Sequence, residues 1–228
     1  MTRPFAVRLP LEEAYRRSVL FAIELLDAVT LSRVSESVKV VAEGLQGKPI
    51  VNAGGLFVWL QEDLGNLRKV SIDPGRLPYE GLELEPAQLR LPPNPVPLTT
   101  VQLSPRVDYL FPAGATGLRG TLIEQRVPQP TPVGNAEVRL RWLDDNGVWH
   151  DAPTKTRTDP RRGDFVSVLR LSPTDVPELD KDGNVTVRLR ARRAANERSS
   201  ADLKLLHGRV TDPSTANALT FAWDELQP

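Results

Sequence analysis

Proline is the sequence feature that most restricts what this chain can fold into. It accounts for 21 of the 228 residues, nearly twice the usual share of about 5%. Each proline lacks a backbone N–H and clashes with the preceding turn of a helix, so a mostly helical protein is excluded. The densest proline run and its continuation comprise Pro92, Pro93, Pro95, Pro97, Pro105 and Pro112. We expect this run to be extended and semi-rigid and to connect two domains.

Apolar residues recur mostly with period two between turns rich in Gly, Pro, Asn and Asp, which is typical of strands. In the first half, strands are predicted at residues 19–25, 37–42, 56–60, 67–72, 81–84 and 98–103. In the second half, they are predicted at 118–124, 136–142, 154–158, 165–171, 184–191, 203–210 and 218–223. This strand density indicates an all-β fold of two tandem antiparallel β-sandwich domains.

The domain organisation follows from these patterns. We expect an N-terminal arm at 1–17, a first β-sandwich domain at 18–110 and a second at 111–228. Leu11–Arg17 has Glu–Arg pairs at i,i+4 spacing after a proline, which suits a short helix, and the alternative is an extended arm. Each half contains an alternating strand, a Gly-containing turn and a Phe-led strand, which suggests duplication of one unit.

Composition excludes several classes of function. The chain has no cysteine, so a disulfide scaffold, a thiolate metal site and a cysteine nucleophile are excluded. Its 29 basic and 29 acidic side chains balance, so we expect no nucleic-acid partner and no insertion into membranes. Charges at positions 12, 13, 16 and 17 interrupt the N-terminal apolar run before it reaches the length of a signal sequence. We therefore expect a cytoplasmic protein, or part of a particle assembled in the cytoplasm.

Three segments of the second half carry a family resemblance: Gly117-Leu-Arg-Gly120-Thr121, Gly134-Asn-Ala136-Glu-Val138, and Thr156-Arg-Thr158-Asp159 followed by Gly163-Asp-Phe165. In this order they resemble the carboxypeptidase regulatory-like domains, which are small transthyretin-like or immunoglobulin-like β-sandwiches. The first half resembles a more diverged copy. The resemblance implies a structural, spacer or interaction module. A transthyretin-like enzyme, hydroxyisourate hydrolase, needs clustered histidines and a C-terminal Tyr-Arg-Gly-Ser element, which this sequence lacks.

The remaining polar candidates favour structural roles. His150 and His207 lie in strands far apart in the sequence, and we expect both to be structural or surface residues. Asp180–Asn184 and Asp144–Gly147 are read as hairpin turns, because the first lacks the bidentate acid of a calcium loop. Residues Glu80, Glu83 and Glu85 are read as a solvated strand face. No catalytic residue, metal site or cofactor is predicted.

Arginines and tryptophans supply the candidate binding residues. Arg188, Arg190 and Arg192 alternate with apolar residues, which predicts a basic stripe on one sheet face. Further arginines at 139, 141, 193 and 198 would extend it. The alternative is a solvated face on which these arginines pair with Glu137, Glu197 or Asp202. Trp59 and Trp142 are predicted to be core residues, whereas Trp149 and Trp223 are candidate exposed anchors for a partner.

These observations predict a non-catalytic structural or protein-binding component of a larger assembly, such as a phage-tail-like or contractile-injection particle. Its partners would be other proteins or further copies of the chain, because sheet edges invite docking of strands. The Pro-rich segment Leu89–Pro97 and residues 1–17 are the candidate docking elements. The alternative is a carbohydrate-binding or adhesin-like module that would stack a glycan on exposed tryptophans.

Overall fold

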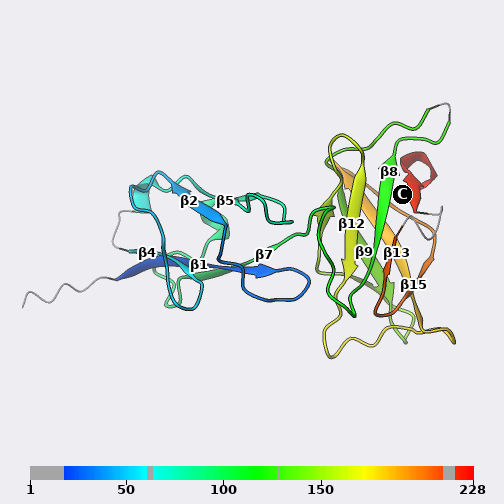
Figure 1. Ribbon diagram of the computed structural model, residues 1–228, viewed down its shortest axis with the longest axis horizontal. Helices are drawn as coiled ribbons and strands as arrows, with labels where there is room; N and C mark the ends of the chain where they lie inside the picture. The colour runs from blue at the N-terminus through cyan, green and yellow to red at the C-terminus, as the bar shows by residue number, and fades with distance from the viewer. Residues whose placement is uncertain (1–17, 61–63, 128, 213–218) are drawn as a thin grey trace, which may run out of the picture.

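The computed structural model describes residues 18–60, 64–127, 129–212 and 219–228. Within them the chain forms strands and three single-turn 3-10 helices at Leu64–Asn66, Pro86–Gln88 and Trp223–Glu225. The prediction of an all-β fold is therefore confirmed. Figure 1 shows β1–β7, the first unit, at one end of the molecule and β8–β17, the second unit, at the other. The predicted arm at residues 1–17 lies outside the described residues.

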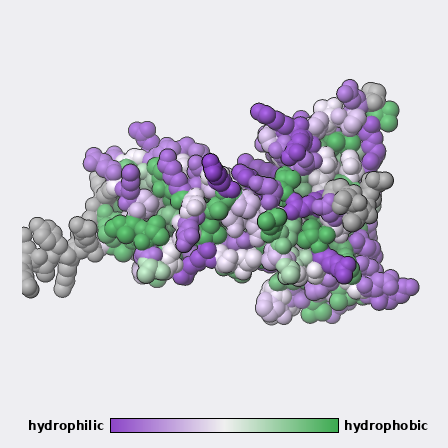
Figure 2. Space-filling view, viewed as in Figure 1, coloured by the Kyte–Doolittle hydropathy of each residue, from purple (hydrophilic) through white to green (hydrophobic). Residues whose placement is uncertain are grey.

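The first unit consists of two sheets around one core. Its strands are β1 (Val19–Asp27), β2 (Lys39–Glu43), β3 (Ile50–Val51), β4 (Phe57–Leu60), β5 (Lys69–Asp73), β6 (Leu82–Leu84) and β7 (Leu98–Leu103). One sheet has the order β3-β4-β1-β7, and the other has the order β2-β5-β6. Because side chains alternate between the two faces of a strand, Phe21, Trp59 and Val70 point inward. They lie in one buried cluster to which both sheets contribute. Figure 2 shows hydrophobic side chains also gathered on the visible surface of this unit.

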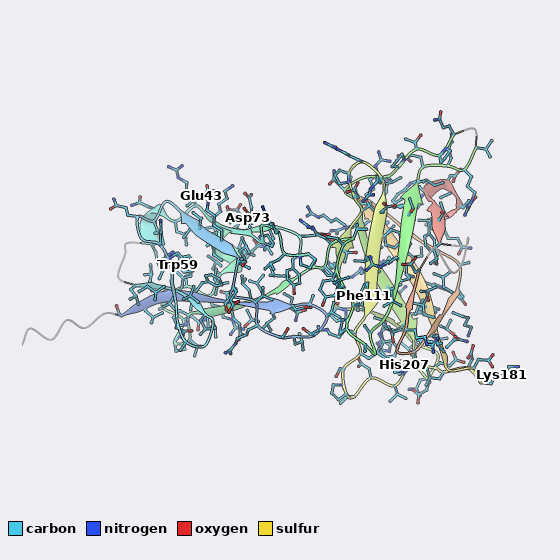
Figure 3. All side chains as sticks on the ribbon, viewed as in Figure 1. Glu43, Trp59, Asp73, Phe111, Lys181 and His207 are labelled. Atoms are coloured by element: carbon cyan, nitrogen blue, oxygen red, sulfur yellow. The ribbon has the colours of Figure 1, made fainter. Side chains whose placement is uncertain are left out.

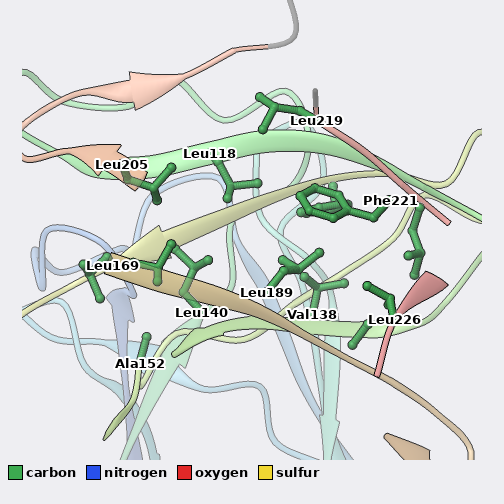
Figure 4. Packing of buried hydrophobic residues seen from close by; sticks show 14 of the residues in the cluster. Leu118, Val138, Leu140, Ala152, Leu169, Leu189, Leu205, Leu219, Phe221 and Leu226 are labelled. Atoms are coloured by element: carbon green, nitrogen blue, oxygen red, sulfur yellow. The ribbon is translucent and has the colours of Figure 1, made fainter. Parts of the chain in front are cut away.

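The second unit repeats this plan on a larger scale. Its strands are β8 (Thr116–Ile123), β9 (Glu137–Leu143), β10 (Trp149–Asp151), β11 (Thr156–Arg157), β12 (Asp164–Leu169), β13 (Asn184–Arg193), β14 (Asn196–Ser199), β15 (Leu203–Leu206), β16 (Val210–Thr211) and β17 (Thr220–Ala222). One sheet has the order β10-β9-β13-β14, with β11 on β9 and β15 on β13. The other has the order β12-β8-β16, with β17 on β8. Leu118, Leu140 and Leu189 lie in the core that these sheets enclose (Figure 4).

The two units share one topology. In each, the first strand pairs antiparallel with a middle strand, as β1 does with β4 and β8 with β12. The same first strand pairs parallel with a late strand, β7 in the first unit and β16 in the second. In the facing sheets, β2-β5-β6 corresponds to β9-β13-β15. This correspondence agrees with the hypothesis of a duplicated unit.

Purely antiparallel pairing was expected, and that expectation is wrong, because β7, β16 and β17 each run parallel to the first strand of their unit. Period-two alternation is the same in parallel and antiparallel strands, so it contains no information on direction. The predicted strand at 203–210 is also wrong. It divides at Gly208, where φ is +76°, into β15 in one sheet and β16 in the other.

The Pro-rich run does not connect the two units. Pro97 leads directly into β7, and its carbonyl accepts a hydrogen bond from Ala22 N in β1 at 2.8 Å. Asn94 N donates to Leu91 O at 3.1 Å, so the run contains a turn instead of being extended throughout. The chain passes between the units at residues 104–115, which we call the connecting segment. Of the prolines in the predicted run, this segment contains only Pro105 and Pro112.

Two buried threonines, Thr158 of the Thr-x-Thr element and the nearby Thr154, provide a matched test of buried hydrogen bonds. Thr158 Oγ1 donates to Val133 O at 2.6 Å and accepts from Ala136 N at 2.9 Å, whereas the buried Thr154 Oγ1 has no hydrogen-bond partner among the described residues. Thr158→Val should lower the free energy of unfolding by about 2 kcal/mol, because two buried backbone groups lose their partner. Thr154→Val should be neutral or stabilising. Urea denaturation followed by circular dichroism measures both, and equal losses would contradict this assignment.

Candidate functional sites: the arginine face and the joint between the units

The structure brings the predicted arginine stripe together. Arg188, Arg190 and Arg192 project from β13 on the face of the sheet opposite the core. In the register of β13 and β9, Arg188 lies opposite Arg141 and Arg190 lies opposite Arg139. The stripe and its extension on the neighbouring strand therefore form one surface, which we call the arginine face.

Carboxylates neutralise most of this charge. Arg188 Nε lies 2.6 Å from Asp202 Oδ1, and Arg192 Nη2 lies 3.0 Å from Glu137 Oε2. Arg190 contacts Glu197, and its Nη1 lies 3.1 Å from Asp151 Oδ2. These are the pairs of the solvated-face alternative, with Asp151 added from β10. Partly exposed ion pairs of this kind contribute little stability. Their effect is to balance the charge of the arginine face.

Arginines also cover the two candidate anchor tryptophans. The Arg188 guanidinium lies 4.2 Å from the centroid of the Trp149 ring. Arg198 lies 5.3 Å from the Trp223 ring and donates to Trp223 O at 2.7 Å. Both tryptophans are half-buried. A sugar ring could not stack on the tryptophan faces that these guanidinium groups occupy.

The remaining tryptophans and the two histidines named in the sequence analysis lie in several different surroundings. Trp59 and Trp142 are buried, as predicted. His150 stacks on Trp142 and its Nε2 lies 2.8 Å from Asp144 Oδ2. His207 is exposed in the turn that follows β15 and is labelled in Figure 3. The two histidines therefore have different surroundings.

The acidic turn residues hold backbone groups. Asp180 Oδ1 accepts from the N–H groups of Asp182 and Asn184 at 3.0 and 2.9 Å. These bonds, with the Asn184 side chain, lower the pKa of Asp180. The hydrogen bond from His150, together with backbone N–H groups, lowers the pKa of Asp144. In the described part of the chain, no three His, Asp or Glu side chains gather as metal ligands would.

A joint that sequence reasoning missed connects the two units. Arg119, on β8, donates from its guanidinium to the carbonyl oxygens of Val107 and Tyr109 in the connecting segment. The same guanidinium lies 5.1 Å from the Phe111 ring, which Figure 3 shows between the units. Val166, opposite Arg119 in the register, is buried although it lies outside the core cluster. The connecting segment therefore covers the outer face of the β12-β8-β16 sheet.

A buried carboxylate anchors the other side of the joint. Asp27, at the end of β1, is 4% exposed. Its Oδ2 accepts from the hydroxyl groups of Tyr79 and Tyr109 at 2.9 and 2.6 Å. Its Oδ1 accepts from Val29 N and Thr30 N at 2.6 and 3.2 Å. Burial raises the pKa of both tyrosines, and Asp27 raises it further, so both hydroxyls stay protonated donors.

Arg119 of the second unit and Asp27 of the first unit both form hydrogen bonds with Tyr109 of the connecting segment. The Tyr109 side chain bonds to the first unit, and its carbonyl bonds to the second. A lone arginine in an otherwise uncharged strand and a strand that ends in Asp were the available sequence signals. Neither signal identifies the partner in the connecting segment, because Tyr109 lies 10 residues from Arg119 and 82 residues from Asp27 in the chain.

Beside the joint, a cavity of about 700 Å³ lies between the units. Its lining includes three arginines and three carboxylates: Arg106, Arg157, Arg162, Glu80, Asp108 and Asp159. Arg106 and Asp108 form a two-bond pair at 3.1 and 2.7 Å. Glu80 Oε1 accepts from the backbone N–H of Arg157 at 2.7 Å, which links β11 to the first unit. The expectation that Glu80 is simply solvated is wrong, because this contact half-buries it.

Glu80 makes the stability of the protein depend on pH. Burial raises the pKa of its carboxyl above the usual 4.5. The folded state therefore binds this proton more tightly than the unfolded chain, and Glu80 contributes more stability as the pH falls through the raised value. Glu80→Gln keeps the acceptor for Arg157 N–H but removes the charge. The variant should gain stability relative to the wild type at pH 7 and lose that advantage near pH 4.5. Thermal unfolding at both pH values measures the difference, and a pH-independent difference would contradict it.

Comparison with known proteins found no relative. No protein family, no curated protein and no solved structure matches this chain. The carboxypeptidase regulatory-like resemblance and the assignment of each unit to a transthyretin-like or immunoglobulin-like sandwich stay predictions. In the described residues, no helix has the length and apolar character needed to span a membrane.

Proposed function

We propose that this protein is a non-catalytic structural and protein-binding component of a larger assembly. The joint is the observation that carries the proposal. Domains on one chain move relative to each other by default unless their interface restrains them. Here Arg119 and Asp27 bond to the connecting segment from both units. This arrangement supports a spacer that presents surfaces at its two ends with a set separation and orientation.

The repeated β-unit, the arginine face and the free sheet edges support a role in protein contacts. The resemblance to carboxypeptidase regulatory-like domains points the same way, because such domains serve as spacers and interaction modules. We extend the proposal to a particle of the phage-tail or contractile-injection type, assembled in the cytoplasm from other proteins or further copies of this chain. The arginines that cover faces of Trp149 and Trp223 disfavour the glycan-binding alternative.

Sedimentation of source-cell lysate, with immunodetection of the chain, tests this function. We expect the chain to sediment in a particle far heavier than its own 25.2 kDa. Arg119→Met should loosen the joint and reduce incorporation into that particle, while the second unit keeps its circular dichroism spectrum. The matched control is Arg161→Met, an exposed arginine in a turn of the second unit. Recovery of the wild type only as a 25.2 kDa monomer would overturn the proposal.

A further inference from the structure

A groove of about 420 Å³ opens in the first unit between β2 and β3. β2 is the outermost strand of one sheet, and β3 is the outermost strand of the other. No described strand pairs with the outer edge of either. The two sheets of this unit therefore leave an open side, where the outer edges of β2 and β3 lack a paired strand among the described residues and the loop 44–49 that joins them lines the groove.

The groove reaches the hydrophobic core. Val40, Ala42 and Phe57 line it, and all three belong to the buried cluster of the first unit. Val51, at its rim, is 48% exposed, and its neighbour Ile50 is 50% exposed. Exposed apolar side chains next to a free strand edge are the combination that receives an added strand. The main chain provides hydrogen bonds, and alternate side chains enter the groove.

The charges that line the groove favour an added strand with acidic side chains. Lys39 and Lys48 line it, and none of the other described residues that line it is acidic. Neither lysine forms an ion pair with a described residue, whereas the nearby Glu43 lies 3.5 Å from Lys69, which also pairs with Glu83 at 2.6 Å. An extended segment with apolar side chains facing the groove and acidic side chains beside the lysines would complement both features.

We propose that this groove binds an extended segment of a partner protein that alternates apolar with acidic residues and adds as a strand to the edge of β2. The inference rests on the proposed function and specifies one of its contacts. The bound segment would extend the β2-β5-β6 sheet and close the open side of the core. Lys39 and Lys48 would set its charge preference, and Val41, 39% exposed on β2, would contact it directly.

Fluorescence anisotropy with labelled model peptides of about eight residues tests the proposal. A peptide alternating Glu and Val should bind at least about tenfold more tightly than one alternating Lys and Val, and added salt should reduce that ratio. The double variant Lys39→Glu with Lys48→Glu should reverse the preference. The control, Lys181→Glu with Arg161→Glu, makes the same charge change on the second unit and should leave the preference unchanged.

Amide hydrogen exchange identifies the position of the added strand. On binding of the Glu–Val peptide, the backbone amides of β2 should exchange more slowly, because they gain hydrogen bonds, while those of β13 should not change. Equal affinity for the two peptides, no binding of either, or a preference unchanged by the double variant would each overturn the proposal.

A second copy of the chain is the competing occupant. Light scattering that detects a dimer of the wild type, and a monomer for Val41→Arg, would assign the groove to self-association and overturn the partner proposal. Sedimentation separates failure here from failure of the proposed function. A chain that fails to bind peptide but still sediments in a heavy particle overturns only the groove. A chain that fails both tests overturns both.

Discussion

Asp27→Ala is expected to lower the free energy of unfolding by on the order of 3–5 kcal/mol. The substitution removes a buried carboxylate that accepts four hydrogen bonds, two from tyrosine hydroxyls and two from backbone N–H groups. Tyr109 is itself 4% exposed, so its hydroxyl loses its partner where bulk water does not reach it. Chemical denaturation followed by circular dichroism measures the loss.

Single hydroxyl deletions show whether the carboxylate acts as a shared acceptor. Tyr109→Phe should cost about 1.5–3 kcal/mol in the wild type, the range for a hydrogen bond to a charged group. In the Asp27→Ala background the same substitution should cost close to nothing, because the acceptor is gone. Equal costs in both backgrounds, or a loss below about 1 kcal/mol for Asp27→Ala, would contradict the role assigned to this residue.

Gly163→Ala is expected to cost on the order of 3 kcal/mol or more. Gly163 has φ +71°, and a Cβ there would collide with the carbonyl oxygen of Leu122 in the paired strand. The backbone cannot withdraw, because Gly163 N donates to Asp159 O at 2.9 Å. The Asp159 carboxylate also accepts from Arg161 N and Arg162 N, which lowers its pKa and holds the turn.

Gly147→Ala is the matched control. Gly147 has nearly the same φ, +77°, but no atom of the described part of the chain lies within 4 Å of the position of a Cβ. It should therefore cost only the left-handed conformational penalty of about 1 kcal/mol. The difference between the two free energies of unfolding isolates the steric contact. If both substitutions cost the same, the close approach at Gly163 does not constrain the fold.

The strand pattern and the turns of this protein could be predicted because both depend on neighbouring residues. Alternation of apolar and polar side chains placed β1, β9 and β13 close to their observed ranges. The two-residue strand β3 is too short for a periodic pattern to identify, whereas β11 lies within the strand predicted at 154–158. β14 was missed because its residues Asn196–Ser199 are polar throughout. The pairing of the arginine face with Glu137, Glu197 and Asp202 was one of two interpretations of the sequence. Which arginine meets which carboxylate is visible only once the register of adjacent strands is set.

The sequence by itself determined the all-β class, the core tryptophans Trp59 and Trp142, and the Asp–Gly turns, because these follow from local alternation and backbone preferences. Only the tertiary structure decided the parallel pairing of first and late strands, the change of sheet at Gly208, and the groove between β2 and β3. It also decided that Arg119, Tyr109 and Asp27 form one joint. Residues up to 82 positions apart meet there, and such contacts depend on how two sheets and a connecting segment pack in space.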